Sequence, residues 1–404
     1  MLRAIFTSWA FLAVASLATA TDYSLPGPRS AGYTTVTVTR ANNTTFTARF
    51  FYPALTTGSG AAFDATGAPY PAITFGHGFL QAPSAYQGTL QHLATWGYFI
   101  IASESQGSFA PSHQGLADDM RTTLDWLSAQ NANASSPYFG RVDVNAYGMS
   151  GHSMGAGCSI LAAAVDPRVK ALANMAAAET SPSAIGAIAN VNCPVMLLSG
   201  SQDGTVPVAT NGQLMYAAAH APRQLPVITG GYHCGFVDTP SFGGLGCDSG
   251  SIPKAIQLAI ARRKLTSFFE TYLHRNASAW GQTWGEGVQT DSAVLTTLDA
   301  GCRVRIANSR VGASAGSTVE VRGAIENTDN APDGYTLFAE GVSWPMTFGS
   351  TVTPTAATGE SVPFILRVTI PAGTVSGISR IVVSARRNSD VGTRAFGECG
   401  VKVR

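Results

Sequence analysis

Short apolar runs alternate with stretches of helical character through the middle of the chain. The apolar runs are typical of buried strands and lie at residues 73–75, 98–102, 142–147, 171–175, 194–198 and 225–228. The patterns between and after them predict helices at residues 86–95, 115–129, 153–165, 208–219 and 252–273. Strands that alternate with helices predict a doubly wound, mostly parallel α/β sheet, and residues 34–52 predict an antiparallel hairpin at its edge.

The pattern of apolar and polar residues changes near residue 300. Beyond it, short runs of alternating polarity such as "STVEVRGAI" and "VPFILRVTI" are separated by Gly, Pro, Asn and Asp, and no helical stretch occurs. This pattern predicts a smaller all-β sandwich. We therefore expect a larger α/β domain over residues 21–299 and a β-sandwich domain over residues 300–404.

The N-terminus has the pattern of a secretory signal peptide. Arg3 precedes an apolar run over residues 5–17, and "ATA" at residues 18–20 matches a cleavage site. The run is too short to span a bilayer comfortably, and no second run of that length follows. We expect residues 1–20 to be removed and the protein to be secreted, either outside the cell or into a periplasm, without an integral membrane segment.

Charge changes this picture little. Charged residues make up 12% of the chain and the net charge is +1, which excludes the basic surface that nucleic acids or anionic membranes require. We expect a monomer that meets neutral, partly apolar material.

The clearest chemical signal is "GHSMGAG" at residues 151–157. A buried strand precedes it, a helix follows it, and Gly151 and Gly155 flank Ser153 at two residues on each side. This is the pattern of a nucleophile elbow, a sharp turn that exposes a serine hydroxyl above a sheet. An ordinary glycine-rich turn is the alternative, and catalytic partners would decide between them.

Both partners can be assigned from their order along the chain. A serine needs a histidine base and a carboxylate that orients it, and in this fold they follow the serine on loops after later strands. His233 follows the last predicted strand, whereas His220 and His274 lie in predicted helices. Asp203 follows the strand at 194–198, whereas Asp166 falls toward the opposite edge of the sheet. We predict Ser153, His233 and Asp203 as nucleophile, base and acid.

Backbone N–H groups that stabilise an oxyanion are expected at two residues. One is Met154, directly after the nucleophile, and the other is Phe79 in "FGHGF", where glycines let the loop after the first central strand turn inward. His77 is expected to shape this loop. Phe79, Tyr232 and Phe236 should line a substrate cleft. No lid-sized segment interrupts residues 175–194, which favours bulky or polymeric substrates.

Six cysteines suit an oxidising compartment, and their spacing matches no zinc site. Cys234 and Cys247 bracket the loop after the predicted base, and a disulfide there would hold His233 in place. We also predict a disulfide between Cys302 and Cys399, near the two ends of the sandwich. Cys158 and Cys193 are expected to stay as buried thiols.

These motifs resemble those of α/β hydrolases of the bacterial cutinase and polyester hydrolase group. The resemblance rests on "GHSMGAG", "FGHGF", "SGSQDGTVP", "YHCGF" and the long final helix, and chlorophyllases, dienelactone hydrolases and platelet-activating-factor acetylhydrolases are more distant relatives. It implies an α/β-hydrolase fold, the same five site residues, no cofactor and no metal. The sandwich resembles immunoglobulin-like accessory domains, which serve as adhesion modules or as spacers.

The sequence therefore predicts a secreted serine hydrolase of carboxylic esters. The expected substrates are short- and medium-chain esters and aliphatic polyesters or cutin-like polymers. Three alternatives stay open. A thioesterase, amidase or dienelactone hydrolase is the first, although a usual dienelactone hydrolase would carry cysteine at residue 153. The other two lie further from this chemistry or its substrates. One of them is a lipid esterase or lipase of the platelet-activating-factor acetylhydrolase type, and the other is a non-catalytic adhesion protein on a hydrolase scaffold.

Overall fold

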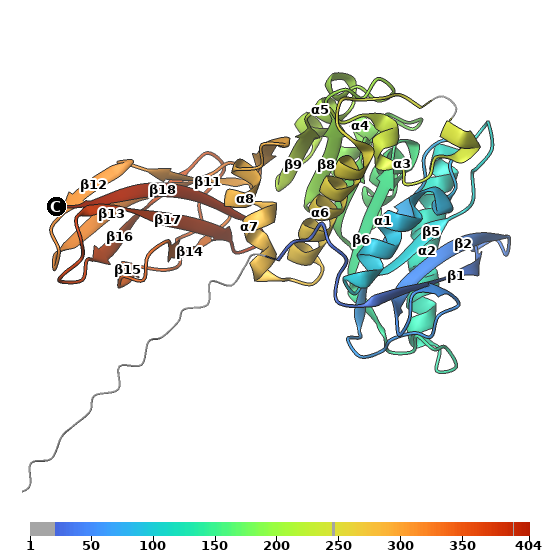
Figure 1. Cartoon of the computed structure of the whole chain (residues 1–404), viewed down its shortest axis with the longest axis horizontal. Coiled ribbons are helices and arrows are strands. Elements are labelled where there is room, and N and C mark those ends of the chain that lie inside the picture. Colours follow the sequence, from blue (N-terminus) through green and yellow to red (C-terminus); the bar gives the residue numbers. More distant parts are fainter. Residues whose placement is uncertain (1–20, 245–246, 391) are drawn as a thin grey trace, which may run out of the picture.

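The computed structural model describes residues 21–244, 247–390 and 392–404. The predicted signal peptide lies outside the described residues. A large sheet flanked by helices fills the first part of the chain, and a β-sandwich follows beside it (Figure 1). The predicted fold class is thus confirmed. Among the described helices, none combines the length and the apolar character needed to cross a membrane.

The large sheet has ten strands in the order β10-β9-β8-β7-β6-β4-β5-β2-β1-β3. Strands β4 to β9 pair in parallel, whereas β1, β2 and β10 join the sheet antiparallel. The strands are β1 (Ser30–Thr39), β2 (Thr45–Ala54), β3 (Gly58–Ser59), β4 (Tyr70–Gly76), β5 (Phe99–Ser103), β6 (Val142–His152), β7 (Val169–Met175), β8 (Val195–Gly200), β9 (Arg223–Ile228) and β10 (Val294–Asp299).

Helices cover both faces of this sheet. Apolar residues of α1 and α6 pack on one face, and those of α2, α3, α4 and α5 pack on the other. The helices are α1 (Gln87–Thr95), α2 (His113–Ala132), α3 (Met154–Ala163), α4 (Ala184–Ala187), α5 (Gly212–Ala218), α6 (Lys254–Tyr272), α7 (Trp280–Thr283) and α8 (Glu286–Gln289). Between β7 and β8 lie only α4 and one 3₁₀ turn, η2 (Ile188–Asn190), so no lid domain is inserted there.

The sandwich consists of two four-stranded sheets, β11-β13-β16-β15 and β12-β18-β17-β14, around their own apolar core. Alternation is clearest in β16, whose residues are exposed and buried in turn. The strands are β11 (Cys302–Ile306), β12 (Arg310–Ala313), β13 (Thr318–Asn327), β14 (Tyr335–Glu340), β15 (Met346–Phe348), β16 (Ser361–Thr369), β17 (Gly377–Arg387) and β18 (Arg394–Val403).

The sandwich packs against the end of α6 and against α7, beside which it lies in Figure 1. The Tyr272 hydroxyl bonds to Thr393 Oγ1 at 2.6 Å and accepts a hydrogen bond from Trp284 Nε1 at 2.8 Å. Trp280 meets Phe396 edge to face. Because these polar and aromatic contacts are largely buried, the sandwich is docked on the α/β part rather than tethered to it.

The predicted disulfide between Cys302 and Cys399 is wrong. Both cysteines are buried thiols. The Cys302 sulfur lies 4.0 Å from the carbonyl of Ala385, which pairs with Ala395, whereas Cys399 pairs with Ile381. Four residues of β18 therefore separate the two cysteines, about 13 Å along a strand, whereas a disulfide needs Cα atoms within about 7 Å. Cys158 and Cys193 are buried thiols, as expected.

His92 on α1 makes the protein sensitive to acid. Its side chain is 5% exposed, and Nε2 lies 3.1 Å from the carbonyl of Tyr23 and 3.2 Å from Thr266 Oγ1. Burial, and to a smaller extent the charge of the nearby Arg262, lowers the pKa of His92 to about 4. The unfolded chain therefore binds more protons than the folded one below pH 6.5, and stability falls as the pH drops from there toward 4.

We expect His92 to cost about 2 to 3 kcal/mol of folding free energy between pH 6.5 and 4.5. His92→Gln keeps an N–H donor for the Tyr23 carbonyl but cannot titrate. Urea unfolding at both pH values should show a smaller acid loss in the variant, by about that amount. Equal losses in the two proteins would contradict the assignment.

Candidate active site

Ser153 sits at the turn between β6 and α3, in a backbone conformation that serine rarely adopts. Its φ is 55° and its ψ is −122°, a strained combination that persists only where the surrounding structure imposes it. The carbonyl of Ser153 accepts hydrogen bonds from Ala156, Gly157 and Ala178, and its N–H donates to Met175 at the end of β7. The half-buried Ser153 is therefore fixed between two strands and a helix.

Three glycines make this turn possible. A β-carbon on Gly155 would lie 2.1 Å from the carbonyl carbon of Gly76, and one on Gly151 would lie 2.5 Å from Gly155. Gly76 and Gly151 also pair directly across β4 and β6. The glycines of "FGHGF" and "GHSMG" thus touch one another, which brings the turn after β4 against the serine turn.

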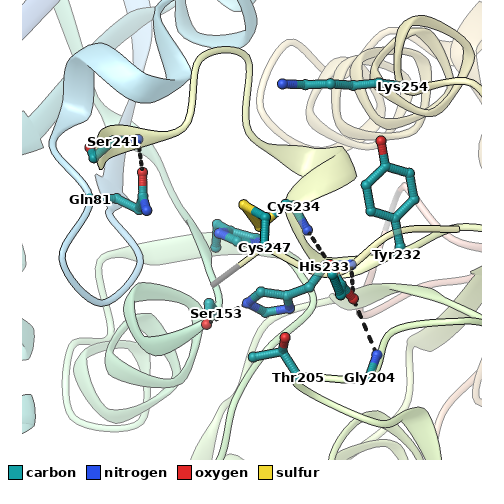
Figure 2. The surroundings of a disulfide bond; sticks show 12 residues. Gln81, Ser153, Gly204, Thr205, Tyr232, His233, Cys234, Ser241, Cys247 and Lys254 are labelled. Carbon is teal, nitrogen blue, oxygen red and sulfur yellow. Dashed lines mark hydrogen bonds between the residues drawn. A yellow bond between two sulfur atoms is a disulfide. The ribbon is translucent and has the colours of Figure 1, made fainter. Parts of the chain in front are cut away.

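The three side chains predicted as nucleophile, base and acid lie in one hydrogen-bonded row. Ser153 Oγ is 2.9 Å from His233 Nε2, and His233 Nδ1 is 2.8 Å from Asp203 Oδ2. The side chains of His233 and Asp203 are both buried. Figure 2 shows the His233 ring directed at Ser153. This arrangement can move a proton from the serine hydroxyl to the imidazole.

Asp203 is held by its own turn. Its Oδ1 accepts hydrogen bonds from the N–H groups of Thr205, at 3.0 Å, and Val206, at 2.6 Å. The other carboxylate oxygen is left for His233. The turn after β8 thus presents one acceptor to His233 in a fixed direction.

The two predicted oxyanion donors lie on the adjacent turns. Met154 is the first residue of α3, so its N–H has no acceptor within the helix. Phe79 follows β4 by three residues, in the turn that also holds His77. His77 is fully buried, and its ring nitrogens lie 2.9 Å from the carbonyl of Gly78 and 2.8 Å from that of Ser105. His77 thus ties this turn to the loop after β5, as expected.

Two residues that the sequence did not point to lie behind the site. Tyr86, fully buried, accepts a hydrogen bond from the N–H of Gly78 at 3.0 Å and lies 2.9 Å from Nδ1 of His152. The hydroxyl proton of Tyr86 is free to be donated to this ring nitrogen of His152. Burial holds the pKa of His152 well below its ordinary value, and neighbouring His233 lowers it further. The His152 ring packs on His233 at 4.5 Å between centroids and does not compete with it as a base.

The three residues predicted to line a substrate cleft differ in their exposure and direction. Phe79 is 46% exposed, whereas Phe236 is 0% exposed and packs on His152, so its assignment to the cleft is wrong. Phe236 ends the 3₁₀ turn η4 (His233–Phe236), which directs its ring into the core. The Tyr232 side chain points away from Ser153 (Figure 2) and packs against Gly250.

The segment around His233 is fastened at several points. Cys234 and Cys247 form the predicted disulfide (Figure 2). Gln257 of α6 accepts from the N–H of Tyr232 and donates to its carbonyl, at 3.1 and 2.7 Å. Asp248 accepts from the backbone of His233 as well. Neither Gln257 nor Asp248 was predicted, because nothing in their local sequence indicates these long-range contacts.

The comparisons with known proteins agree with this arrangement. The family model described as "PETase: PET hydrolase-like" matches residues 17–241, which is more than half of the chain. The chain belongs to the PET hydrolase-like family. Its matched region includes Ser153, Asp203 and His233 but not the sandwich. The resemblance to cutinases and polyester hydrolases is therefore confirmed.

A curated relative comes from plants. The chain is 33% identical to chlorophyllase-1 of Arabidopsis thaliana over 90 residues, which are 21% of this chain and 26% of chlorophyllase-1. The match thus spans about a quarter of that relative. Together, the PET hydrolase-like family and this relative support an ester hydrolase. Among the described residues, no group of three or more His, Cys, Asp or Glu side chains is placed to hold a metal ion.

Proposed function

We propose that the protein is a secreted serine hydrolase of carboxylic esters that works through an acyl-enzyme. The observation that carries the proposal is the unbroken row from Asp203 through His233 to Ser153, with both hydrogen bonds below 3 Å. A serine hydroxyl is a weak nucleophile until a positioned base accepts its proton. The strained turn at Ser153 supports the same reading, because such strain clusters at reactive residues.

The reaction then follows from the geometry. His233 Nε2 takes the proton as Ser153 Oγ attacks the ester carbonyl, and Asp203 holds the imidazole and stabilises its positive charge. The negative oxygen of the tetrahedral intermediate accepts hydrogen bonds from the N–H groups of Met154 and Phe79. His233 returns the proton to the leaving alkoxide. Water, activated by the same imidazole, then releases the acid and restores Ser153.

We propose short- and medium-chain esters and aliphatic polyesters as substrates. The short connection between β7 and β8 and the exposed ring of Phe79 support an open site that a polymer chain can reach. An apolar surface of this kind contributes about 0.8 kcal/mol per covered methylene, but only for the carbons that it covers. A lipid esterase is the alternative.

Secretion and the division into two domains, at residues 21–299 and 300–404, are part of the proposal. The Cys234–Cys247 disulfide supports secretion, since such bonds persist in oxidising compartments. β10 pairs within the large sheet and β11 within the sandwich, which supports a boundary between them.

The proposal predicts a defined chain-length profile. With p-nitrophenyl esters from C2 to C16, kcat/KM should be highest near C4 to C8 and fall at C16, and an aliphatic polyester film should release soluble acid. The rate on tributyrin should not jump at its solubility limit, because no lid has to open. An optimum at C16 with dependence on an oil–water interface would assign a lipase instead, and inactivity on every ester would remove the esterase proposal.

A further inference from the structure

One carboxylate outside the catalytic row contacts the backbone of both the acid turn and the base turn. Asp248 Oδ2 accepts from the N–H of His233 at 2.9 Å and from the N–H of Gly204 at 3.2 Å, while Oδ1 accepts from the N–H of Cys234 at 3.0 Å. Gly204 directly follows Asp203. The single Asp248 side chain therefore links the residue next to the acid with the base and its neighbour.

Hydrogen bonds of this kind are strong because the acceptor is charged. They act on main-chain atoms, so they set where each turn lies rather than how one side chain rotates. The distance between Asp203 and His233 depends on two loops that follow different strands, β8 and β9. The two loops also meet directly, since the N–H of Gln202 donates to the carbonyl of Gly231 and that of Gly230 donates to Ser201 Oγ. Asp248 adds bonds closer to the two side chains, at Gly204 and at His233 itself.

The disulfide fixes the position from which this carboxylate extends. Cys247 immediately precedes Asp248, and its sulfur is bonded to Cys234, whose own N–H donates to Asp248. The disulfide and the Asp248 carboxylate thus both connect residues 247–248 to residues 233–234. Both cysteines are half-buried, which leaves the bond open to a small reductant.

We propose that Asp248 is a positioning residue that holds Asp203 and His233 in register, and that the Cys234–Cys247 disulfide supports catalysis through Asp248. The inference rests on the proposed function of Ser153, Asp203 and His233. It assigns to the disulfide a role in the geometry of the acid and the base, beyond the general stabilisation that closing a loop provides.

The test compares two Asp→Asn variants. In Asp248→Asn, an amide NH₂ replaces one carboxylate oxygen and faces backbone N–H groups, so at least one of the three hydrogen bonds is lost. We expect kcat for p-nitrophenyl butyrate to fall about 10- to 100-fold with KM within about twofold, the scale of a misplacement near 1 Å. Active sites are counted by phosphonate titration of Ser153, and circular dichroism at the assay temperature verifies folding.

Asp238→Asn is the matched control. Asp238 lies in the same loop, but its carboxylate bonds to the N–H of Thr89 and to Arg262, away from the catalytic turns. This variant should lose stability and keep kcat. A purely structural Asp248 would behave like Asp238, with a lower Tm and an unchanged kcat per titrated site, and that result would overturn the proposal.

Reduction tests the part played by the disulfide. A phosphine supplies two electrons to the Cys234–Cys247 bond, and water supplies the oxygen of the phosphine oxide and the two protons of the resulting thiols; the other four cysteines are already thiols. Reduction should lower kcat of the wild-type protein but change that of Asp248→Asn by less than about twofold. If reduction lowered kcat of Asp248→Asn by the same factor as it lowers kcat of the wild type, the disulfide would act independently of Asp248. That result would overturn this part of the proposal.

The results distinguish a failure of the positioning role of Asp248 from a failure of the proposed esterase function. Wild-type protein that hydrolyses no ester, or an active Ser153→Ala variant, would remove the proposed function. An active wild-type protein, an inactive Ser153→Ala and a fully active Asp248→Asn would remove only the positioning role.

Discussion

Replacing Ser153 by alanine should lower kcat for p-nitrophenyl butyrate by about 10⁴-fold or more, because removal of a catalytic serine typically costs several orders of magnitude. The Ser153 hydroxyl contacts His233 Nε2 at 2.9 Å, and this bond is lost in the variant. The change removes one oxygen and little packing volume, and alanine meets the same backbone strain as serine. We therefore expect an unchanged circular dichroism spectrum and no phosphonate incorporation at residue 153.

Ser159→Ala provides the control for this substitution. Ser159 lies on α3, six residues from Ser153, and its buried hydroxyl donates to the carbonyl of Ala156 and contacts Asn174. Losing these bonds should lower the free energy of unfolding by about 1 to 2 kcal/mol while kcat changes little. A folded Ser153→Ala protein that keeps more than about a hundredth of the wild-type activity would refute the assignment of the nucleophile.

The positions of Ser153, Asp203 and His233 could be predicted because each depends on local pattern and chain order. Each residue follows a short apolar strand, and the carboxyl ends of parallel strands meet at one edge of a sheet. The spacing of the glycines around Ser153 also set this turn apart from ordinary turns. The close contacts of Gly76, Gly151 and Gly155 leave no room for a β-carbon, which explains that spacing. What was predicted is therefore the part of the site that the sheet itself brings together.

The contacts that support the site could not be predicted in this way. Tyr86 and His152 are 66 residues apart, and Asp248 reaches Gly204 across 44 residues. Such pairs depend on loop conformation, which no periodicity records. The assignment of Phe236 to the cleft was wrong for a related reason. The 3₁₀ turn η4, which begins at His233, decides whether the Phe236 ring faces solvent or core.

Strand register explains the error in the sandwich. The sequence places Cys302 and Cys399 near the two ends of the domain, but it does not show which residues lie opposite one another on neighbouring strands. The edge strand β10 was missed because it is half exposed, with Leu295 at 76%, and lacks the continuous apolar run of the central strands. Buried parallel strands are thus easier to recognise than solvated antiparallel ones.

The Asp203→Asn variant should lose about 10⁴-fold in kcat although its structure is almost unchanged. The Asn Oδ1 can still accept from Thr205 and Val206, so the turn after β8 is kept. Its NH₂ group then faces Nδ1 of His233 as a donor, which forces the imidazole proton onto Nε2. With a hydrogen between Nε2 and Ser153 Oγ, the imidazole has no lone pair to accept the serine proton. KM should change only a few-fold, since no substrate contact is removed.

Asp166→Asn is the control for this substitution. It alters a buried carboxylate paired with Arg168 far from Ser153, and it should lower the Tm and leave kcat almost unchanged. An Asp203→Asn protein with nearly normal kcat would mean that another group orients His233, and the row from Asp203 to Ser153 would then not be the catalytic one.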